Sequence, residues 1–238
     1  MKLFDTYMEG AGKLLAPYLN TTTARTVSTD GPAWPLAEKN PFIMERDTAV
    51  ELGGYPKESV NLIVSSSGPL PAEDLTVIES AADGTNHISF GRVVFLQTEE
   101  ISDEQVYEFQ QAVQLADLRL KLQDAMTRTS SRQYQMNLRI GKKAAENGLD
   151  LDAMARSVQQ HFLQIPQVKK AAVFLIAGES SLYRELLPVA EKVKDVTVAL
   201  NTMFDGIDMD CGSCSLNEIC DEVEGLRELH RKKQAETV

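Results

Sequence analysis

The sequence has few of the residues that most often carry chemistry. Its 238 residues include three cysteines, three histidines and one tryptophan, and aromatic residues make up 6%. No Ser/His/Asp arrangement, phosphate-cradling glycine loop or paired-carboxylate motif is present. No apolar run approaches the roughly 20 residues that span a bilayer, so we expect no membrane helix. The composition therefore excludes the commonest hydrolase and nucleotide-binding signatures.

Positive charge is also scarce. Lys and Arg total 24 against 35 Asp and Glu, which gives a formal net charge of −11. Such a chain repels nucleic acid and anionic membranes, so we expect neither as a partner, although a local basic pocket would still suit a small anion. The N-terminal residues contain Asp5 and lack the apolar core of a signal peptide, so we expect a cytoplasmic protein.

The three cysteines lie within ten residues, at Cys211, Cys214 and Cys220. A C-x2-C pair followed closely by a third thiol is typical of a chelate, and soft thiolates select zinc or iron–sulfur clusters. An odd number of cysteines also argues for thiolate chemistry over disulfides.

Three thiolates leave a fourth ligand open. The candidates are Asp210, Asp221, His230, water, a small molecule or a residue of a partner chain. A [4Fe–4S] cube with one open iron, a zinc site and a trio of unmetallated thiols all remain as alternatives.

The pattern of apolar residues predicts an N-terminal helix over residues 2–19 and then an extended Pro-rich arm that contains Trp34. Short apolar runs separated by Gly and Pro predict four strands, and such short connections favour an antiparallel or mixed meander. The predicted strands are Thr48–Leu52, Val60–Ser65, Leu75–Glu79 and Ile88–Leu96.

The sequence pattern predicts mainly helices in the second half of the chain. Ser102 and Gln105 form an expected capping box. The predicted elements are helices from Ser102 to Asp124, Asp150 to Ile165 and Glu179 to Lys194, strands over Lys170–Ala177 and Val196–Leu200, and a last helix from Asp221. We therefore expect an α+β fold in which helices pack on a mixed or antiparallel sheet. The expected parts are an N-terminal helix and arm (1–44), an α+β domain (45–204) and a cysteine metal loop with a C-terminal helix (205–238).

Three segments carry a family resemblance. They are Ala49–Gly54, Met136–Lys142, and Phe174–Val193 leading to Cys211-x2-Cys214. In order and spacing, residues 45–220 resemble the middle domain of the β subunit of the CO dehydrogenase/acetyl-CoA synthase complex. In that family an arginine-rich surface handles coenzyme A, and cysteines hold a [4Fe–4S] cluster bridged to a dinickel centre.

The resemblance implies a site for coenzyme A. Arg139 and Lys142 match a family arginine and lysine, Arg128 stands where the family has tryptophan, and Arg132 lies nearby. With Lys143 these residues concentrate positive charge on an acidic chain, and the alternative is a solvated basic loop.

The departures from the family concern the metal ligands. The third thiol follows after five residues where the family has eight, a fourth cluster cysteine is missing, and the nickel-binding Cys-Gly-Cys has no counterpart. Too few donors remain for a nickel–iron–sulfur centre. We therefore expect an accessory or subunit, and not a free-standing synthase.

The expected function is that of an iron–sulfur protein in anaerobic one-carbon (CO/acetyl-CoA) metabolism. Its partners would be other CO dehydrogenase/acetyl-CoA synthase or one-carbon pathway proteins, and a homo-oligomer is left open. The alternative is a non-catalytic interaction module whose zinc or cluster is structural, and a sensor that uses the open iron is a third class. His87 and His161 are expected to be structural.

Overall fold

The structure is a computed structural model that describes residues 2–39, 41–72, 75–81, 84–128, 134–146, 148–178, 180–204 and 214–237. The fold in these ranges is α+β, as expected, with six α-helices and two mixed sheets. The helices are α1 (Asp5–Leu19), α2 (Val106–Arg119), α3 (Leu151–Phe162), α4 (Leu182–Phe204), α5 (Asn217–Glu222) and α6 (Leu226–Thr237), with a 3-10 turn at Glu45–Asp47. The strands are β1 (Ala24–Val27), β2 (Thr48–Gly53), β3 (Ser59–Ser66), β4 (Leu75–Glu79), β5 (His87–Ile88), β6 (Phe90–Thr98), β7 (Ala125–Thr127), β8 (Asn137–Gly141) and β9 (Val168–Ala177).

The larger sheet has the strand order β1-β4-β9-β6-β3 and the smaller one β5-β2-β8-β7. In the larger sheet β3 runs parallel to β6 and β4 parallel to β9, whereas β6 and β9 are antiparallel. The mixed sheet was expected, but the meander was wrong. β9, which is apolar on both faces, inserts between β4 and β6 and keeps the early strands from pairing in chain order.

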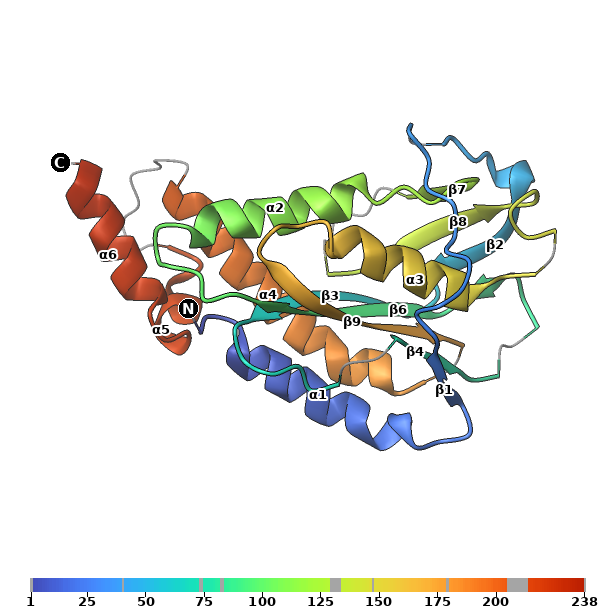
Figure 1. Cartoon of the computed structure of the whole chain (residues 1–238), viewed down its shortest axis with the longest axis horizontal. Helices are drawn as coiled ribbons and strands as arrows, with labels where there is room; N and C mark the ends of the chain where they lie inside the picture. The colour runs from blue at the N-terminus through green and yellow to red at the C-terminus, as the bar shows by residue number, and fades with distance from the viewer. Residues whose placement is uncertain are drawn as a thin grey trace.

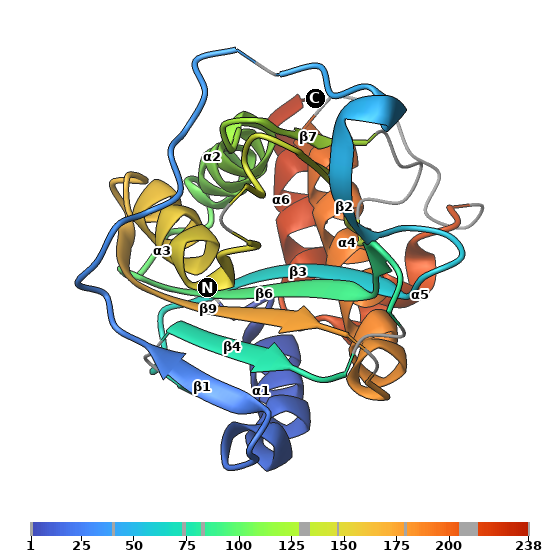
Figure 2. The ribbon, with the colours of Figure 1, turned by 90° about the vertical axis from the view of Figure 1, so that its right-hand side faces the viewer.

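Helices cover both faces of the larger sheet (Figures 1 and 2). α1 contacts β1, β3 and β4 from one face, and α3 contacts β4 and β9 from the other. α2 and the smaller sheet lie on the α3 side, as Figure 2 shows. The core is centred on β9, where Ala172–Ile176 are at most 1% exposed. Within the described ranges every helix is too short or too polar to cross a bilayer.

The segment after α1 packs along the domain. β1 pairs with β4 as an edge strand. The indole of Trp34 is 6% exposed and donates to the carbonyl of Gln123 at 3.0 Å, while the Ser157 hydroxyl donates to the Trp34 carbonyl at 2.6 Å. The single tryptophan thus fastens the arm to α3 and to the segment between α2 and β7.

Two local predictions were wrong in the region of α2 and α4. Gln105 precedes α2 without a side-chain cap, and Ser102 Oγ donates to Gln105 Oε1 at 3.2 Å, so the two side chains bond each other and not the backbone. The strand expected at Val196–Leu200 belongs to α4. Val193, Val196 and Leu200 are spaced by three and four and are buried on one helix face, a pattern that a five-residue window cannot distinguish from a buried strand.

Helix ends and short strands account for the other differences. α3 begins as expected, with Asp150 accepting from the Ala153 N–H at 2.8 Å, but it ends at Phe162. The last helix is two helices, α5 and α6, separated at Gly225, whose φ is 85°, a left-handed conformation that favours glycine. β1, β7 and β8 were not predicted.

Candidate metal site and ligand cavities

Two of the three cysteines lie in the described part of the chain. Cys214 precedes α5 and Cys220 lies within it, whereas Cys211 falls outside the described residues. Both described thiols are half-buried, and the backbone N–H of Leu216 donates to Cys214 Sγ at 3.4 Å. Hydrogen bonds to sulfur stabilise the thiolate form and tune the potential of a bound cluster.

The helix that carries Cys220 is fixed to the body of the protein. α5 contacts α4 and α6, Ile219 is 8% exposed, and Glu222 forms an ion pair with Lys192 of α4. Tyr7 of α1 lies close by: burial, together with the negative charges of Glu222 and Asp195, raises the pKa of its phenol to about 12. Glu222 of the cysteine segment therefore lies near enough to the N-terminal helix to act on Tyr7 electrostatically.

The candidates for the fourth ligand differ in their surroundings. The Asp221 carboxylate is in an ion pair with Arg227, and His230 is buried at 7% exposure on α6. Asp210 lies outside the described residues. Within the described ranges no three His, Cys, Asp or Glu side chains are grouped to hold a metal, and because Cys211 is not among them the three-cysteine site stays a prediction.

The predicted basic site is a charge cluster in the smaller sheet. Arg128, next to β7, and Arg139 on β8 both pair with Glu51 on β2, with Arg139 Nε lying 3.5 Å from Glu51 Oε2. Glu51 and Arg139 stand opposite each other in register, and their side chains are 16% and 17% exposed. Lys142 is exposed at the end of β8, and Arg132 falls outside the described residues. The structure thus brings two of the four cations together, around a carboxylate.

The cysteine segment and the basic cluster lie far apart. Figure 1 places α5 and α6 at one end of the long axis and β2, β7 and β8 at the other. α2 runs between the two regions: Asp103, just before it, pairs with Lys232 of α6 at 2.7 Å, and Arg128 lies beyond its other end. At 1.5 Å per residue, its 14 residues alone account for about 20 Å.

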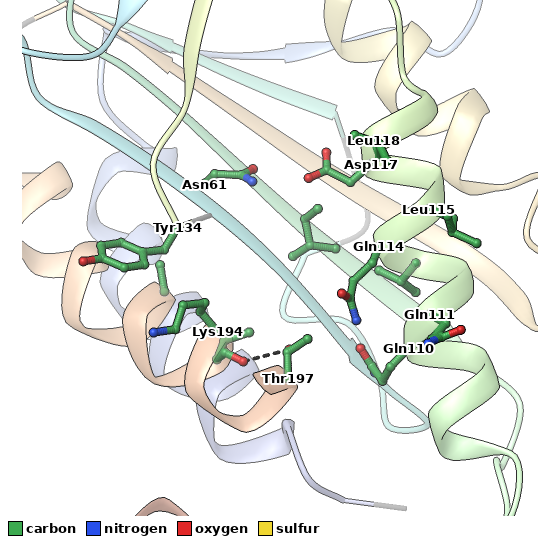
Figure 3. Close-up of a pocket in the computed structure, with 14 residues that line it drawn as sticks. Asn61, Gln110, Gln111, Gln114, Leu115, Asp117, Leu118, Tyr134, Lys194 and Thr197 are labelled. Carbon is green, nitrogen blue, oxygen red and sulfur yellow. Dashed lines mark hydrogen bonds between the residues drawn. The ribbon is translucent and has the colours of Figure 1, made fainter. Parts of the chain in front are cut away.

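A cavity of about 460 Å³ lies between β3, α2 and α4 (Figure 3). Most of its polar side chains are bonded to other side chains. Gln110 donates to Ser65 at 3.1 Å and Gln114 to Asn201 at 3.4 Å, while the Lys194 ammonium pairs with Asp195 and lies 5.8 Å from the centre of the Tyr134 ring. These contacts leave few groups to recognise a ligand.

A second cavity, of about 420 Å³, lies between the two sheets and shares Asn61, Asp117 and Leu118 with the first. Arg92 of β6 lines it, although this arginine stands within an otherwise apolar strand and its side chain is only 4% exposed. Arg92 donates to Asn61 Oδ1 through Nε and Nη2, at 3.0 and 2.8 Å, and pairs with Asp117. Sequence reasoning missed this site, and the signal that could have found it was an arginine inside a buried apolar run.

The two histidines that were expected to be structural both contact backbone. His87 Nε2 lies 2.8 Å from the Gly53 carbonyl oxygen, and His161 Nε2 lies 2.8 Å from that of Ala116. Each ring thereby links two separate segments of the chain.

Comparison with known proteins adds no assignment. No protein-family model matches the sequence. No curated protein matches it. Function is therefore inferred from the residues and their geometry.

Proposed function

We propose that the chain is an iron–sulfur protein of anaerobic one-carbon metabolism, located in the cytoplasm, in which Cys211, Cys214 and Cys220 bind a [4Fe–4S] cluster. The observation that carries this proposal is the N–H···S hydrogen bond at Cys214, which lies just before the short helix α5 that carries the second half-buried thiol, Cys220. A pre-set hydrogen bond to sulfur is also a feature that tunes the potential of a bound cluster.

The half-buried position of the two thiols suits a cluster that exchanges electrons or binds a ligand at its open iron. Such a cluster supplies a redox centre or a Lewis acid. The chain's own part is to hold Cys214 and Cys220 before and within α5, a helix that Lys192 and Ile219 fasten to the body of the protein. Partners from the CO dehydrogenase/acetyl-CoA synthase pathway would then bind near the α5–α6 end.

Coenzyme A binding at Arg128, Arg132, Arg139 and Lys142 belongs to the same proposal. A phosphate arriving there would compete with Glu51, which accepts a hydrogen bond from Arg128 and forms an ion pair with Arg139. This cluster lies at the far end of α2 from α6, so we expect it to anchor bound coenzyme A through its phosphates.

A second candidate is an interaction module in which zinc or a cluster only fastens the C-terminal helices. One observation favours it: α5 and α6 are joined to α4 and α2 by exposed ion pairs and a few apolar residues, among them Val223 and Leu226. A metal at the cysteines would add a cross-link where the packing is thin.

Replacing Cys214 by Ser tests both candidates, with Ser215→Ala as the matched control at the exposed neighbour. We expect Cys214→Ser to lose metal and to make residues 214–237 open to proteolysis, while α2 and β9 stay protected and the control is unchanged. Metal retained at the wild-type level in Cys214→Ser would refute the chelate. For the wild type, iron with a cluster EPR signal that shifts on adding cyanide supports the open-iron proposal, and one zinc per colourless chain supports the structural alternative.

A further inference from the structure

The cavity between the two sheets contains a buried cation with unused hydrogen-bond donors. A guanidinium carries five N–H groups, and the contacts of Arg92 with Asn61 and Asp117 use the one on Nε and the two on Nη2. Nη1 has no partner among the described residues. The two N–H groups of Nη1 therefore remain as donors on a side chain that is 96% buried and lines the cavity.

Nη1 has open space before it. Among the described side chains, Nε of Arg139 and Nε of Arg227 are fully buried without a hydrogen-bond partner, whereas Nη1 of Arg92 is not among such fully buried atoms. Since Arg92 lines the cavity and is otherwise enclosed, the cavity supplies that space. A buried donor of this kind destabilises the folded protein unless an acceptor or a water molecule occupies the space.

The cavity combines a polar end with buried apolar walls. Asn61, Arg92 and Leu175 stand side by side across β3, β6 and β9, and they form the polar end and part of the floor. The remaining walls come from α3 and the smaller sheet, with Met154, Val158 and Leu138 among the lining residues, each at most 3% exposed. A volume of about 420 Å³ lies within the range of small-molecule sites.

The charge around the cavity is positive. Lys121, half-buried between α2 and β7, lines it and has no ion-pair or side-chain hydrogen-bond partner in the described ranges. Arg128 also lines the cavity, but its charge is balanced by Glu51, which lies outside it. The remaining charges are those of Arg92, Lys121 and Asp117, and they sum to one net positive charge. A single negative charge on the ligand would balance the set.

We propose that this cavity binds a small organic carboxylate with an apolar body, its carboxylate on Arg92 Nη1 and Lys121 and its hydrocarbon against Met154, Val158 and Leu138. Arg92 would then hold two carboxylates, Asp117 through Nη2 and the ligand through Nη1. This site is separate from the cysteine segment and needs no bound metal.

The test uses octanoate, its neutral isostere octanamide, and acetate, each titrated into the full chain by calorimetry at pH 7. Octanoate should bind one per chain with a Kd of about 1 mM or lower. Octanamide should bind at least about tenfold more weakly because it forfeits a charge-assisted hydrogen bond, and acetate should show no saturation because it lacks the apolar body. Absence of octanoate binding at 10 mM, or equal affinity for the amide, would overturn the proposal.

Three variants locate the site. Arg92→Met should weaken octanoate binding by about tenfold to a hundredfold. Ala125→Leu, which fills this cavity from β7, should abolish it, whereas Ala190→Leu, which fills only the neighbouring cavity, should leave it unchanged. Each variant is first shown to be folded by its circular dichroism and thermal transition. A folded Ala125→Leu protein with wild-type affinity would refute the site.

Asp117→Asn gives a test that loss of structure cannot imitate. Removing its negative charge takes away a competitor for Arg92, so octanoate should bind more tightly, by about threefold to tenfold, although the variant is less stable. Weaker or unchanged binding in this variant would contradict the proposed geometry.

Discussion

Glu51 holds two arginines at once, and its removal should destabilise the smaller sheet. Glu51 and Arg139 are 16% and 17% exposed, and Arg128 is 37% exposed. Glu51→Gln keeps the size of the side chain and leaves both cations without a counter-charge. Breaking a fully buried pair costs about 3–5 kcal/mol and an exposed one under about 1, so this intermediate burial gives about 2 kcal/mol.

The assay is thermal unfolding followed by circular dichroism. For a chain of this size 1 kcal/mol corresponds to about 2–4 °C, so Glu51→Gln should lower Tm by about 4–8 °C. The control is Glu99→Gln, whose partner Lys169 lies 3.4 Å away with both side chains more than half exposed, and which should shift Tm by no more than about 2 °C. Equal shifts in the two variants would refute the argument from burial.

The same variant reports on the basic cluster as a phosphate site. If Arg128 and Arg139 contact coenzyme A, releasing them from Glu51 should strengthen coenzyme A binding in Glu51→Gln, and Arg139→Ala should weaken it. A fall in affinity in Glu51→Gln, or no binding by any of the three proteins, would remove the basic cluster from the proposed function.

Two further predictions concern pH and packing. The folded-state pKa of Tyr7 is raised to about 12 from 10. The protonated phenol therefore contributes to the free energy of unfolding in full below pH 10, and this contribution is lost as pH rises through 12. Between pH 9 and 12 the wild type should lose up to about 3 kcal/mol more unfolding free energy in urea than Tyr7→Phe does, and parallel curves would contradict the raised pKa. Leu200→Ala on the buried face of α4 should cost about 2–4 kcal/mol, whereas Leu118→Ala, 75% exposed on α2, should cost under about 0.5; similar losses in both would refute the assignment of Leu200 to the helix core.

Local patterns in the sequence predicted most elements, because each is set by residues close together in the chain. β4 was predicted to the residue, and α1, α3 and β9 within a few residues of their ends. Strand pairing was not predictable in this way: β9 joins β4 and β6 across about 70–100 residues, and nothing local to Leu75 or Phe90 specifies that partner.

The candidate sites likewise differ in whether local sequence patterns or long-range contacts create them. The cysteine spacing is local, so Cys211, Cys214 and Cys220 stand out in the sequence alone. The cavity at Arg92 needs residues from both sheets and two helices, and it exists only after long-range pairing. The neutralising role of Glu51 was likewise hidden, because Glu51 meets Arg128 and Arg139 only across β2 and β8.

The most direct test of the proposed function is the iron and acid-labile sulfide content of the protein purified without oxygen. Three thiolates from Cys211, Cys214 and Cys220 around a cube predict about four irons and four sulfides per chain, broad absorbance near 400 nm, and loss of both in Cys214→Ser. A colourless chain with neither iron nor sulfide, prepared under the same conditions and still folded, would contradict it.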